Sequence, residues 1–342
     1  MRKFKVAVVG TTGAVGLEMI KMLERRNFPT ESIKFLASER SIGKKLTYNG
    51  KEITVELLTK ESGKGIDIAL FSAGATVSKE FAPSFAADGC FVIDNSSAWR
   101  MEKDIPLIVS EVNPHDLKKD KKLIANPNCS TIQMVVVLKP IHDFAKIKRV
   151  IVSTYQSVSG AGQKGINELT EQVKAWAKGE SIPTANKFQY QIAFNLIPQI
   201  DVFTDNGYTK EEMKMTNETK KIMGDTSDTS IEVSATCVRV PVFRSHSENV
   251  WIETEKPILP RQAKELLSKA EGIQLMDEPE SKKYPMPLFA ENMQTTYVGR
   301  IRADISTKNN ALTFWVVSDN LLKGAALNAV QIAETLVKNE LI

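Results

Sequence analysis

The chain has 342 residues, of which 42% are hydrophobic and 25% are charged, and its formal net charge is +4. That length suffices for two domains with complete cores, and the composition excludes disordered and fibrous proteins. The small net charge, with Lys and Arg interspersed among Asp and Glu, excludes a basic stripe for nucleic acid.

The chain shows no signal for export or membrane insertion. Positive charge precedes an apolar run at Val6 to Val9, as in signal peptides, but Gly10 ends that run. No segment reaches the roughly 18 apolar residues of a membrane-spanning helix. Three sparse cysteines cannot form a disulfide framework or a spaced zinc site. We expect a soluble cytoplasmic protein without a metal and without membrane or nucleic-acid partners.

The first third of the chain alternates short strands with helices. Residues 4–9 form an apolar run, which is followed by a glycine-rich turn and a segment with helical apolar spacing. Asn49-Gly50 marks a hairpin. Further strand-like runs lie at 33–36, 68–71, 91–93 and 123–125. Strands separated by helices predict a parallel α/β sheet.

After about residue 128 the pattern changes to longer strand-like runs. They lie at 149–158, 231–240, 297–305 and 312–317. These runs predict a mixed sheet in an α+β domain. Segment 321–337 has apolar residues at helical spacing, and we expect this helix to pack on the first domain. The predicted domains are residues 1–128 with 321–342, and residues 129–320.

Three glycines, Gly10, Gly13 and Gly16, lie between the first predicted strand and the first predicted helix. Glycines there permit a tight turn and a close backbone approach to a pyrophosphate, which the helix N-terminus then faces. The GxxGxxG spacing is a variant of the usual fingerprint, and a plain tight turn is the alternative. The position of the loop favours a dinucleotide.

The second predicted strand runs into Ser38-Glu39-Arg40-Ser41. NAD-preferring sites place an acidic residue at this strand end, where it binds the ribose 2′-hydroxyl. Arg40 between two serines instead suits a 2′-phosphate, so the sequence favours NADP. Glu39 would repel that phosphate if it turned inward, and we expect it to face solvent. A solvated Arg40 without a ligand is the alternative.

Cys129 is the predicted nucleophile. It lies at the end of Asn126-Pro-Asn-Cys, just before an apolar-rich helix at 132–141. A helix N-terminus lowers a thiol pKa, and its free backbone N–H groups can hold an oxyanion. Cys90 lies in an apolar run and Cys237 lies inside a strand, so we expect both in the core.

A thiol nucleophile needs a general base, and the chain has three histidines. His142 lies too far along the helix from Cys129 to reach back. His115 follows Asn113-Pro114 at an expected helix start, with a surface position as the alternative, and His246 lies in a predicted loop after the strand at 231–240, where sites are commonly built. The residues alone leave His115 and His246 as about equal candidates.

Arg239 lies on the same side of its predicted strand as Ile231, Val233, Ala235 and Cys237. A guanidinium on that face requires an anion. A substrate carboxylate bound bidentately would satisfy it, and so would an internal Asp or Glu. The sequence leaves both options open.

Several motifs together resemble the aspartate-semialdehyde dehydrogenase family, over nearly the whole chain. They are the loop Gly10 to Gly16, Asn-Pro-Asn-Cys129, Gln156 in Tyr-Gln-Ser-Val-Ser-Gly-Ala-Gly, Cys-Val-Arg239 with His246 seven residues later, Ser-Ala-Trp-Arg100, and Asn320-Leu-Leu-Lys-Gly-Ala-Ala. The resemblance implies a Rossmann-like NADP-binding domain completed by the C-terminal helix. It also implies a mixed-sheet domain that carries catalysis and the contacts of a homodimer, which could pair into a tetramer.

The resemblance implies a phosphorylating aldehyde dehydrogenase. Its reaction is the NADPH-dependent reductive dephosphorylation of β-aspartyl phosphate to aspartate semialdehyde, toward lysine, diaminopimelate, threonine and methionine. In this family Cys129 would release phosphate and form a thioester that hydride reduces, because thiolate is both nucleophile and leaving group. His246 would be the acid/base residue, Gln156 would position the substrate, and Arg239 would clamp its carboxylate.

The resemblance also implies the remaining contacts. Glu218 resembles the residue that contacts the substrate amino group, and Lys221 resembles one that contacts phosphate. Their i,i+3 spacing puts both on one helix face, with a surface ion pair as the alternative. Arg100 and Asn128 resemble further phosphate contacts. Expected cofactor contacts are Gly10, Thr12, Gly13, Ala14, Val15, Ser38, Arg40, Ser41, Ser72, Ala73 and Gly74, and on the nicotinamide side Ser159, Gly160, Gly162 and Asn320.

Two other functions stay open. N-acetyl-γ-glutamyl-phosphate reductases share a nucleotide domain and a catalytic cysteine with a histidine. Their acetylated substrate amine, however, does not call for a carboxylate such as Glu218. A non-catalytic NADP sensor would leave Cys129, His246, Gln156 and Arg239 without a purpose.

Overall fold

The computed structural model describes residues 2–224, 231–307 and 310–342. It divides the chain into two compact units, Met1–Asn128 with Ala325–Ile342, and Cys129–Gly324. The expected fold class, an α/β nucleotide domain with a second mixed-sheet domain, is confirmed. The C-terminal return to the first unit begins at residue 325, four residues after the expected boundary.

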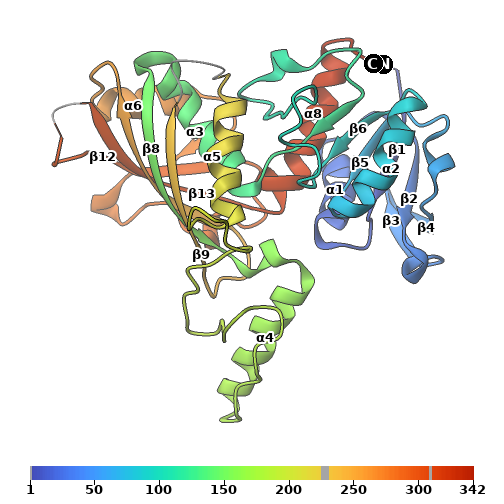
Figure 1. The fold of residues 1–342 in the computed structure, drawn as a ribbon, viewed down its shortest axis with the longest axis horizontal. Helices are drawn as coiled ribbons and strands as arrows, with labels where there is room; N and C mark the ends of the chain where they lie inside the picture. The colour runs from blue at the N-terminus through green and yellow to red at the C-terminus, as the bar shows by residue number, and fades with distance from the viewer. Residues whose placement is uncertain (1, 225–230, 308–309) are drawn as a thin grey trace. The chain divides into compact units, whose positions relative to one another are not determined.

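The first unit is built on a seven-stranded sheet with the order β3-β4-β2-β1-β5-β6-β7 (Figure 1). Its strands are β1 (Phe4–Val9), β2 (Thr30–Ala37), β3 (Lys45–Tyr48), β4 (Lys51–Leu57), β5 (Ile68–Phe71), β6 (Phe91–Asp94) and β7 (Leu123–Ala125). All neighbouring strands are parallel except the β3/β4 hairpin. The hairpin turns at Asn49-Gly50, where both residues have positive φ, as the sequence predicted.

Helices cover both faces of this sheet. They are α1 (Ala14–Arg25), α2 (Ala75–Ala87) and α8 (Leu327–Lys338), with short 3-10 turns η1 (Glu39–Ser41), η2 (Lys60–Gly63) and η3 (Pro114–Asp116). Helix α2 packs on the face that carries Ala7, Val9 and Phe71. Helices α1 and α8 contact each other, and Arg26 pairs with Glu334 at 2.7 Å. The C-terminal helix therefore completes the nucleotide unit.

The second unit contains a mixed six-stranded sheet with the order β11-β12-β13-β10-β8-β9. Its strands are β8 (Ile147–Gln156), β9 (Glu232–Arg239), β10 (His246–Thr254), β11 (Ile273–Leu275), β12 (Thr296–Ala303) and β13 (Ala311–Ser318). The pairs β8/β9 and β11/β12 are parallel, and the others are antiparallel. The expectation of a loop around His246 was wrong, because His246 is the first residue of β10.

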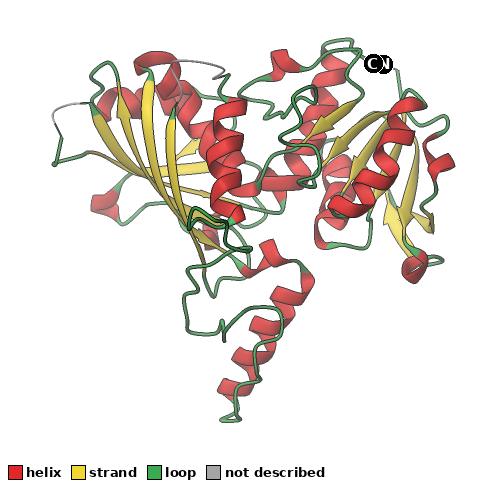
Figure 2. Ribbon diagram, in the orientation of Figure 1, coloured by secondary structure: helices red, strands yellow, loops and turns green. Residues whose placement is uncertain are grey.

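One face of this sheet is covered by α3 (Cys129–Ala145), α5 (Lys210–Ile222) and α6 (Pro260–Lys269), as Figure 2 shows. Alternate strand residues such as Val152, Val250 and Ile252 form a core with α3 side chains that include Met134 and Leu138. The remaining short elements are η4 (Val158–Ala161), η5 (Pro279–Ser281), α7 (Pro287–Ala290) and a π-helical turn at Leu322–Ala326.

An arm made of α4 (Gln163–Ala177) and the irregular segment 178–209 extends from the second sheet (Figure 1). The arm has a hydrophobic core of its own, which includes Leu169, Ile192 and Ile197. The Glu168 carboxylate accepts the backbone N–H of Asn186 at 2.9 Å and so ties the segment to the helix. Within the described ranges, no helix has the length and apolarity that crossing a membrane requires.

Candidate active site

Three loops of the first unit follow the carboxyl ends of neighbouring strands. They lie after β1, β2 and β5 and contain the expected cofactor residues Gly10 to Val15, Ser38 to Ser41, and Ser72 to Gly74. The chain leaves β1 toward β2 and leaves β5 toward β6, so the order reverses between β1 and β5. In open α/β sheets a ligand binds outside the strand ends at this switch point.

The glycines of the first loop are required by backbone geometry. Gly10 has φ +82°, and a Cβ atom there would lie 2.6 Å from the Ser72 carbonyl oxygen. A Cβ atom on Gly16 would lie 2.2 Å from the Gly10 carbonyl oxygen. The N-caps of α1 and α2 are Gly13 and Gly74, and neither has a side chain to occupy the free N–H groups. Two helix N-termini are thus open to an anion.

The loop after β2 exposes the guanidinium of Arg40 at the end of the strand. Within the described ranges, no ion pair ties this guanidinium to a carboxylate. Ser38, Glu39 and Arg40 are exposed, so Glu39 faces solvent as expected. Ser41 is buried, and its hydroxyl lies 3.1 Å from the Thr12 hydroxyl, which links this loop to the glycine loop. Arg100 also belongs to this unit and donates to the Asn95 carbonyl at 2.9 Å, and Asn128 is the last residue before the unit boundary.

Cys129 is the first residue of α3 and is half-buried. The backbone approaches it closely at Gly324, where a Cβ atom would lie 2.7 Å from the Cys129 Cβ. Cys90 and Cys237 are fully buried, and burial raises the pKa of both thiols well above the ordinary value. The expectation that these two are core residues is confirmed, and only Cys129 combines access with a helix N-terminus.

His246 is fully buried, and its imidazole is held by Ser157. The Ser157 backbone N–H donates to Nδ1 at 3.0 Å, and the Ser157 hydroxyl also lies 3.0 Å from that atom. Burial and the nearby Arg239 charge lower the pKa of His246 to about 3. Because a backbone N–H can only donate, the neutral ring carries its proton on Nε2. In the described part of the chain, Nε2 has no hydrogen-bond partner.

A cluster of neutral side chains supports this imidazole. The Asn320 Oδ1 accepts from the Ser157 and Ser159 hydroxyls at 3.2 and 3.1 Å, and from the Ser245 backbone N–H at 2.9 Å. The Asn320 Nδ2 in turn donates to the Ser159 hydroxyl at 3.0 Å. The side chains of Ser159 and Asn320, expected on the nicotinamide side of the site, are therefore engaged with each other and with Ser157.

Arg239 lies beside His246 at the end of β9 and is almost completely buried. Its Nη1 donates to the Ser157 carbonyl at 2.7 Å. Within the described residues no carboxylate lies at ion-pair distance from it, although the buried Glu211 is close enough for its charge to act on the guanidinium. Burial lowers the pKa of Arg239, while the negative charges of Glu211 and of an ionised Cys129 raise it.

Gly160 lies against both groups. A Cβ atom there would lie 3.0 Å from the Arg239 Nη1 and 3.2 Å from the His246 Nε2. The second expected glycine of this loop, Gly162, has φ +76° and caps α4. The turn after β8 thus brings the main chain against the side chains of Arg239 and His246.

Gln156 ends β8 directly beside Arg239, with which it pairs in the parallel register. Its Oε1 accepts from the Thr154 hydroxyl at 3.0 Å, and its Nε2 donates to Glu211 Oε1 at 3.1 Å. Sequence reasoning missed Glu211. The capping box Thr209-x-x-Glu212 was a signal that α5 begins here and that Glu211 lies in its first turn.

Glu218 and Lys221 lie further along α5. Glu211 and Glu218 are both buried, whereas Lys221 is half-buried. Seven residues separate the two glutamates, a spacing that returns to the same face of a helix. Glu212 accepts the Cys237 backbone N–H, and the Thr216 hydroxyl donates to the Val233 carbonyl, so α5 runs back along β9. Glu211 therefore lies at the end of the sheet where Gln156 and Arg239 lie, whereas Glu218 lies toward the start of β9.

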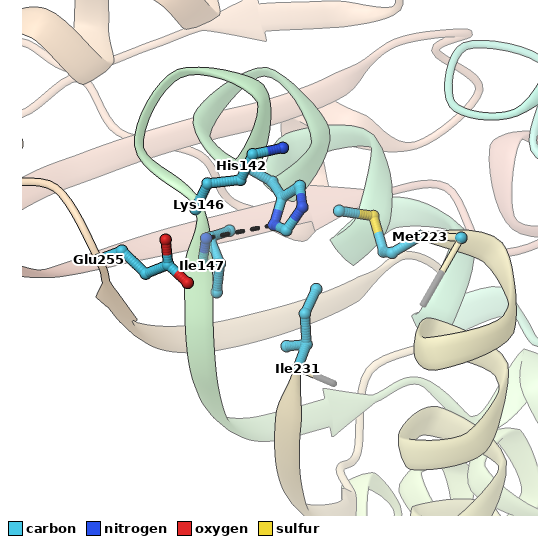
Figure 3. A pocket seen from close by; sticks show the side chains of 7 residues that line it. His142, Lys146, Ile147, Met223, Ile231 and Glu255 are labelled. Atoms are coloured by element: carbon cyan, nitrogen blue, oxygen red, sulfur yellow. Dashed lines mark hydrogen bonds between the residues drawn. The ribbon is translucent and has the colours of Figure 1, made fainter. Parts of the chain in front are cut away.

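The other two histidines lie elsewhere. His115 is exposed on the first unit, 3.7 Å from the Asp116 carboxylate. His142 accepts the Ile147 backbone N–H on Nδ1 at 3.2 Å and lines a separate pocket with Lys146, Met223, Ile231 and Glu255 (Figure 3). The geometry thus favours His246 over His115 as the partner of Cys129.

Comparisons with known proteins agree with this arrangement. The family model for the semialdehyde dehydrogenase NAD binding domain matches residues 5–120, and the model for the semialdehyde dehydrogenase dimerisation domain matches residues 138–323. The aspartate-semialdehyde dehydrogenase of Aquifex aeolicus is 60% identical over 99% of both chains. That of Bacillus subtilis is 51% identical over 100% of this chain and 99% of its own. This chain belongs to the aspartate-semialdehyde dehydrogenase family.

Solved structures agree with membership of the aspartate-semialdehyde dehydrogenase family. Aspartate semialdehyde dehydrogenase II from Vibrio cholerae complexed with ASA has a TM-score of 0.95 at 49% identity, with 99% of each chain covered. The enzyme from Candida albicans with NADP has a TM-score of 0.77 at 25% identity, with 100% of each chain covered. As a member of the aspartate-semialdehyde dehydrogenase family, the chain is an oxidoreductase that acts on an aldehyde.

Proposed function

We propose that the chain catalyses the NADPH-dependent reductive dephosphorylation of aspartyl phosphate to aspartate semialdehyde, on the route to lysine, threonine and methionine. The observation that carries this proposal is the buried Arg239, which lies beside His246 and within electrostatic reach of Cys129. A buried guanidinium that makes no direct ion pair within the described residues favours a carboxylate-bearing substrate at the thiol.

Cys129 is the proposed acyl carrier. The N-terminus of α3 and the Arg239 charge both stabilise its thiolate. The thiolate attacks the acyl carbon of the substrate and forms a C–S bond. The C–O bond to phosphate then breaks, and phosphate leaves with its electron pair.

The resulting thioester is the group to be reduced, and bound NADPH supplies the hydride. His246 Nε2–H donates to the oxygen that becomes negative as the carbonyl carbon turns tetrahedral. With its proton on Nε2, His246 can act as an acid, which supports one of the two functions in its expected acid/base role. When the C–S bond breaks, the carbonyl re-forms and Cys129 leaves as thiolate.

The proposed substrate contacts are those that the family resemblance implies. Arg239 binds the substrate carboxylate, Glu218 binds the free amino group, and Gln156 positions the reacting group. Lys221, Arg100 and Asn128 are proposed to bind phosphate. N-acetyl-γ-glutamyl phosphate carries no amino charge for a carboxylate to bind, so the proposed role of Glu218 distinguishes the two substrates.

The deciding experiment follows NADP⁺ reduction in the presence of aspartate semialdehyde and phosphate. We expect activity that requires both compounds and is absent with N-acetylglutamate semialdehyde. Activity with the acetylated substrate alone would assign the chain to the neighbouring reductase class. No activity with either substrate would leave only a binding role and would refute the proposal.

Arg40 is proposed to select NADP over NAD. Arg40→Ala is expected to raise the KM for NADPH about tenfold, because a charge-assisted contact to the 2′-phosphate is lost. The KM for NADH should stay unchanged, since NADH lacks that phosphate. Exposed Lys44, substituted by alanine, is the matched control. Equal use of both coenzymes by the unaltered chain would refute this assignment.

The second unit is proposed to form a homodimer. The match to a dimerisation domain supports this, and so do apolar side chains exposed on the arm. They are Trp176, Tyr190, Phe194, Leu196, Val202 and Phe203. Trp176 and Phe194 pack against each other with tilted rings, whose centroids are 4.8 Å apart. Large apolar side chains exposed together on one segment are typical of an interaction site.

Phe194→Asp is expected to shift the chain from dimer to monomer, because a charge would be buried in the apolar contact. Light scattering after size-exclusion chromatography measures the mass at several concentrations. Leu57→Asp is the control, because Leu57 is exposed to a similar degree on the nucleotide unit. An unchanged mass for Phe194→Asp would exclude the arm from the interface.

A further inference from the structure

A buried acid lies next to the catalytic histidine in the second unit. Glu248 follows His246 by two residues on β10, so both side chains point to the same face of the sheet. Val250 and Ile252 continue that face and pack in the core with α3. Glu248 is fully buried and is therefore held between its strand and the helix that begins at Cys129.

Among the residues that the structure describes, no positive charge compensates Glu248. Its cross-strand neighbours are Thr154 on β8 and Val316 on β13. From α3, Gln133 is the polar group near enough to affect its pKa, and Cys237 on β9 is the titratable group that senses its charge. Burial raises the pKa of Glu248 well above the ordinary value. An ionised carboxylate here would be a buried charge without a cation, which is strongly unfavourable.

Three polar atoms at this point lack partners within the described residues. They are both carboxyl oxygens of Glu248 and the Gln133 Oε1. A protonated carboxyl satisfies all three when it pairs with the amide. The acid O–H donates to Gln133 Oε1, and Gln133 Nε2 donates to the other carboxyl oxygen. An ionised carboxylate has no proton for Gln133 Oε1 and would leave that atom unsatisfied.

Gln133 joins the two catalytic elements. It lies four residues after Cys129, on the same side of α3. Its Nε2 also approaches the His246 carbonyl oxygen at 3.4 Å. Hydrogen bonds between Gln133 and β10 therefore hold the start of α3 against the start of β10.

We infer that Glu248 is a positioning residue that stays protonated and pairs with Gln133, thereby holding the Cys129 helix against the His246 strand. The pair itself does not depend on which aldehyde the enzyme uses. Only its effect on turnover rests on the proposed function.

The protonation state is tested on the full chain by infrared spectroscopy. The carbonyl stretch of a protonated carboxylic acid is expected at neutral pH, is expected to shift when glutamate is isotopically labelled, and should be missing in Glu248→Gln. Absence of a band removed by that substitution would mean that Glu248 is ionised and would overturn the inference. This measurement needs no substrate, so its failure is distinct from failure of the proposed function.

The stability of the fold gives a second readout. An acid with a raised folded pKa is protonated in the folded chain but ionised in the unfolded chain above about pH 4 to 5. Folding of the unaltered chain should therefore weaken as pH rises above that point, relative to Glu248→Gln. The melting temperatures of the two proteins should converge near pH 4 and separate toward neutral pH. A difference that stays constant with pH would overturn the inference.

The positioning role is tested by turnover. Glu248→Gln keeps a neutral amide pair with Gln133 and is expected to retain kcat within about twofold. Glu248→Leu leaves the side-chain amide of Gln133 without its partner on residue 248. This variant should lower kcat at least tenfold, with KM unchanged within about twofold. Val250→Ala, on the same face of β10, is the control for a purely structural loss and should retain kcat at a temperature where all variants are folded.

Two outcomes would overturn the positioning role. Equal kcat for Glu248→Leu and Val250→Ala would make Glu248 purely structural. An equal loss for Glu248→Gln and Glu248→Leu would show that an ionised carboxylate is needed. If Glu248→Leu does not fold, Gln133→Leu tests the same pair from the helix side, with the rate of Cys129 alkylation as the readout.

Discussion

Cys129→Ser is expected to lower kcat by about 10⁴-fold or more, because the substitution removes the group that forms and releases the acyl intermediate. A helix N-terminus stabilises a thiolate, but it cannot ionise a serine hydroxyl near neutral pH. Serine would also form an ester, which expels its oxygen less readily than a thioester expels sulfur. The measurement is steady-state reduction of NADP⁺ with aspartate semialdehyde and phosphate.

The controls for this prediction are the other two thiols. Cys90→Ala and Cys237→Ala remove fully buried sulfurs from the cores and should reduce stability while leaving kcat nearly unchanged. Mass spectrometry of the enzyme mixed with acyl substrate in the absence of reduced cofactor should detect a covalent adduct on Cys129. Full activity of Cys129→Ser, or an adduct on another residue, would contradict the assignment.

His246→Ala is expected to lower kcat by about 10²-fold to 10³-fold, because the oxygen that becomes negative loses its donor. His246→Gln should recover part of this loss, since a glutamine amide can present an N–H near the position of Nε2. A residue needed only as a base would give equally inactive alanine and glutamine variants. The comparison of the two kcat values therefore separates a donor from a base.

The same substitution tests how the thiol is activated. His246 is neutral because burial and Arg239 lower its pKa to about 3, so it does not stabilise the thiolate by charge. The pH dependence of Cys129 alkylation should thus give the same thiol pKa with and without His246. A higher thiol pKa in His246→Gln would indicate a cysteine–histidine ion pair and would contradict the donor role.

The lowered pKa of His246 also makes stability depend on pH. The unfolded chain binds a proton on this histidine below about pH 6.5, whereas the folded chain does not bind it until about pH 3. Folding therefore loses stability as pH falls through this window. His246→Gln should lose less stability over the same range, which thermal melts of both proteins can measure.

Local sequence was enough to predict the residues whose chemistry depends on neighbours along the chain. The glycine loop, Arg40 after the second strand and Cys129 at a helix start all follow from short-range geometry, and the structure has each in the expected element. The hairpin at Asn49-Gly50 is a further example. In each case the deciding contacts are made within a few residues.

The choice between His115 and His246 could not be made in this way, because it depends on strand pairing. The antiparallel register of β8 and β10 brings Ser157 to the imidazole of His246, 89 residues along the chain. Glu211 reaches Gln156 only because α5 packs on the sheet beside β9. Such long-range pairings are not encoded in the pattern of either segment alone.

The prediction of a loop at the start of β10 was wrong for a physical reason. His246, Ser247, Glu248 and Asn249 are polar and are typical of a loop, yet the first three are fully or almost fully buried. The buried polar side chains there include the imidazole of the proposed active site, and they do not face solvent. Where function places polar groups in a core, the hydrophobic pattern that identifies a strand is lost.

The neutral cradle of His246 has a consequence for the fate of the thioester. Ser157, Ser159 and Asn320 hold the ring with uncharged groups, whereas hydrolases of the Ser-His-Asp type orient their histidine with a carboxylate and use it to deprotonate a nucleophile. With its proton on Nε2 and its lone pair on Nδ1 occupied, this imidazole offers no basic nitrogen to a water molecule. In the proposed mechanism, the acyl-enzyme would thereby be protected from hydrolysis and remain available for reduction.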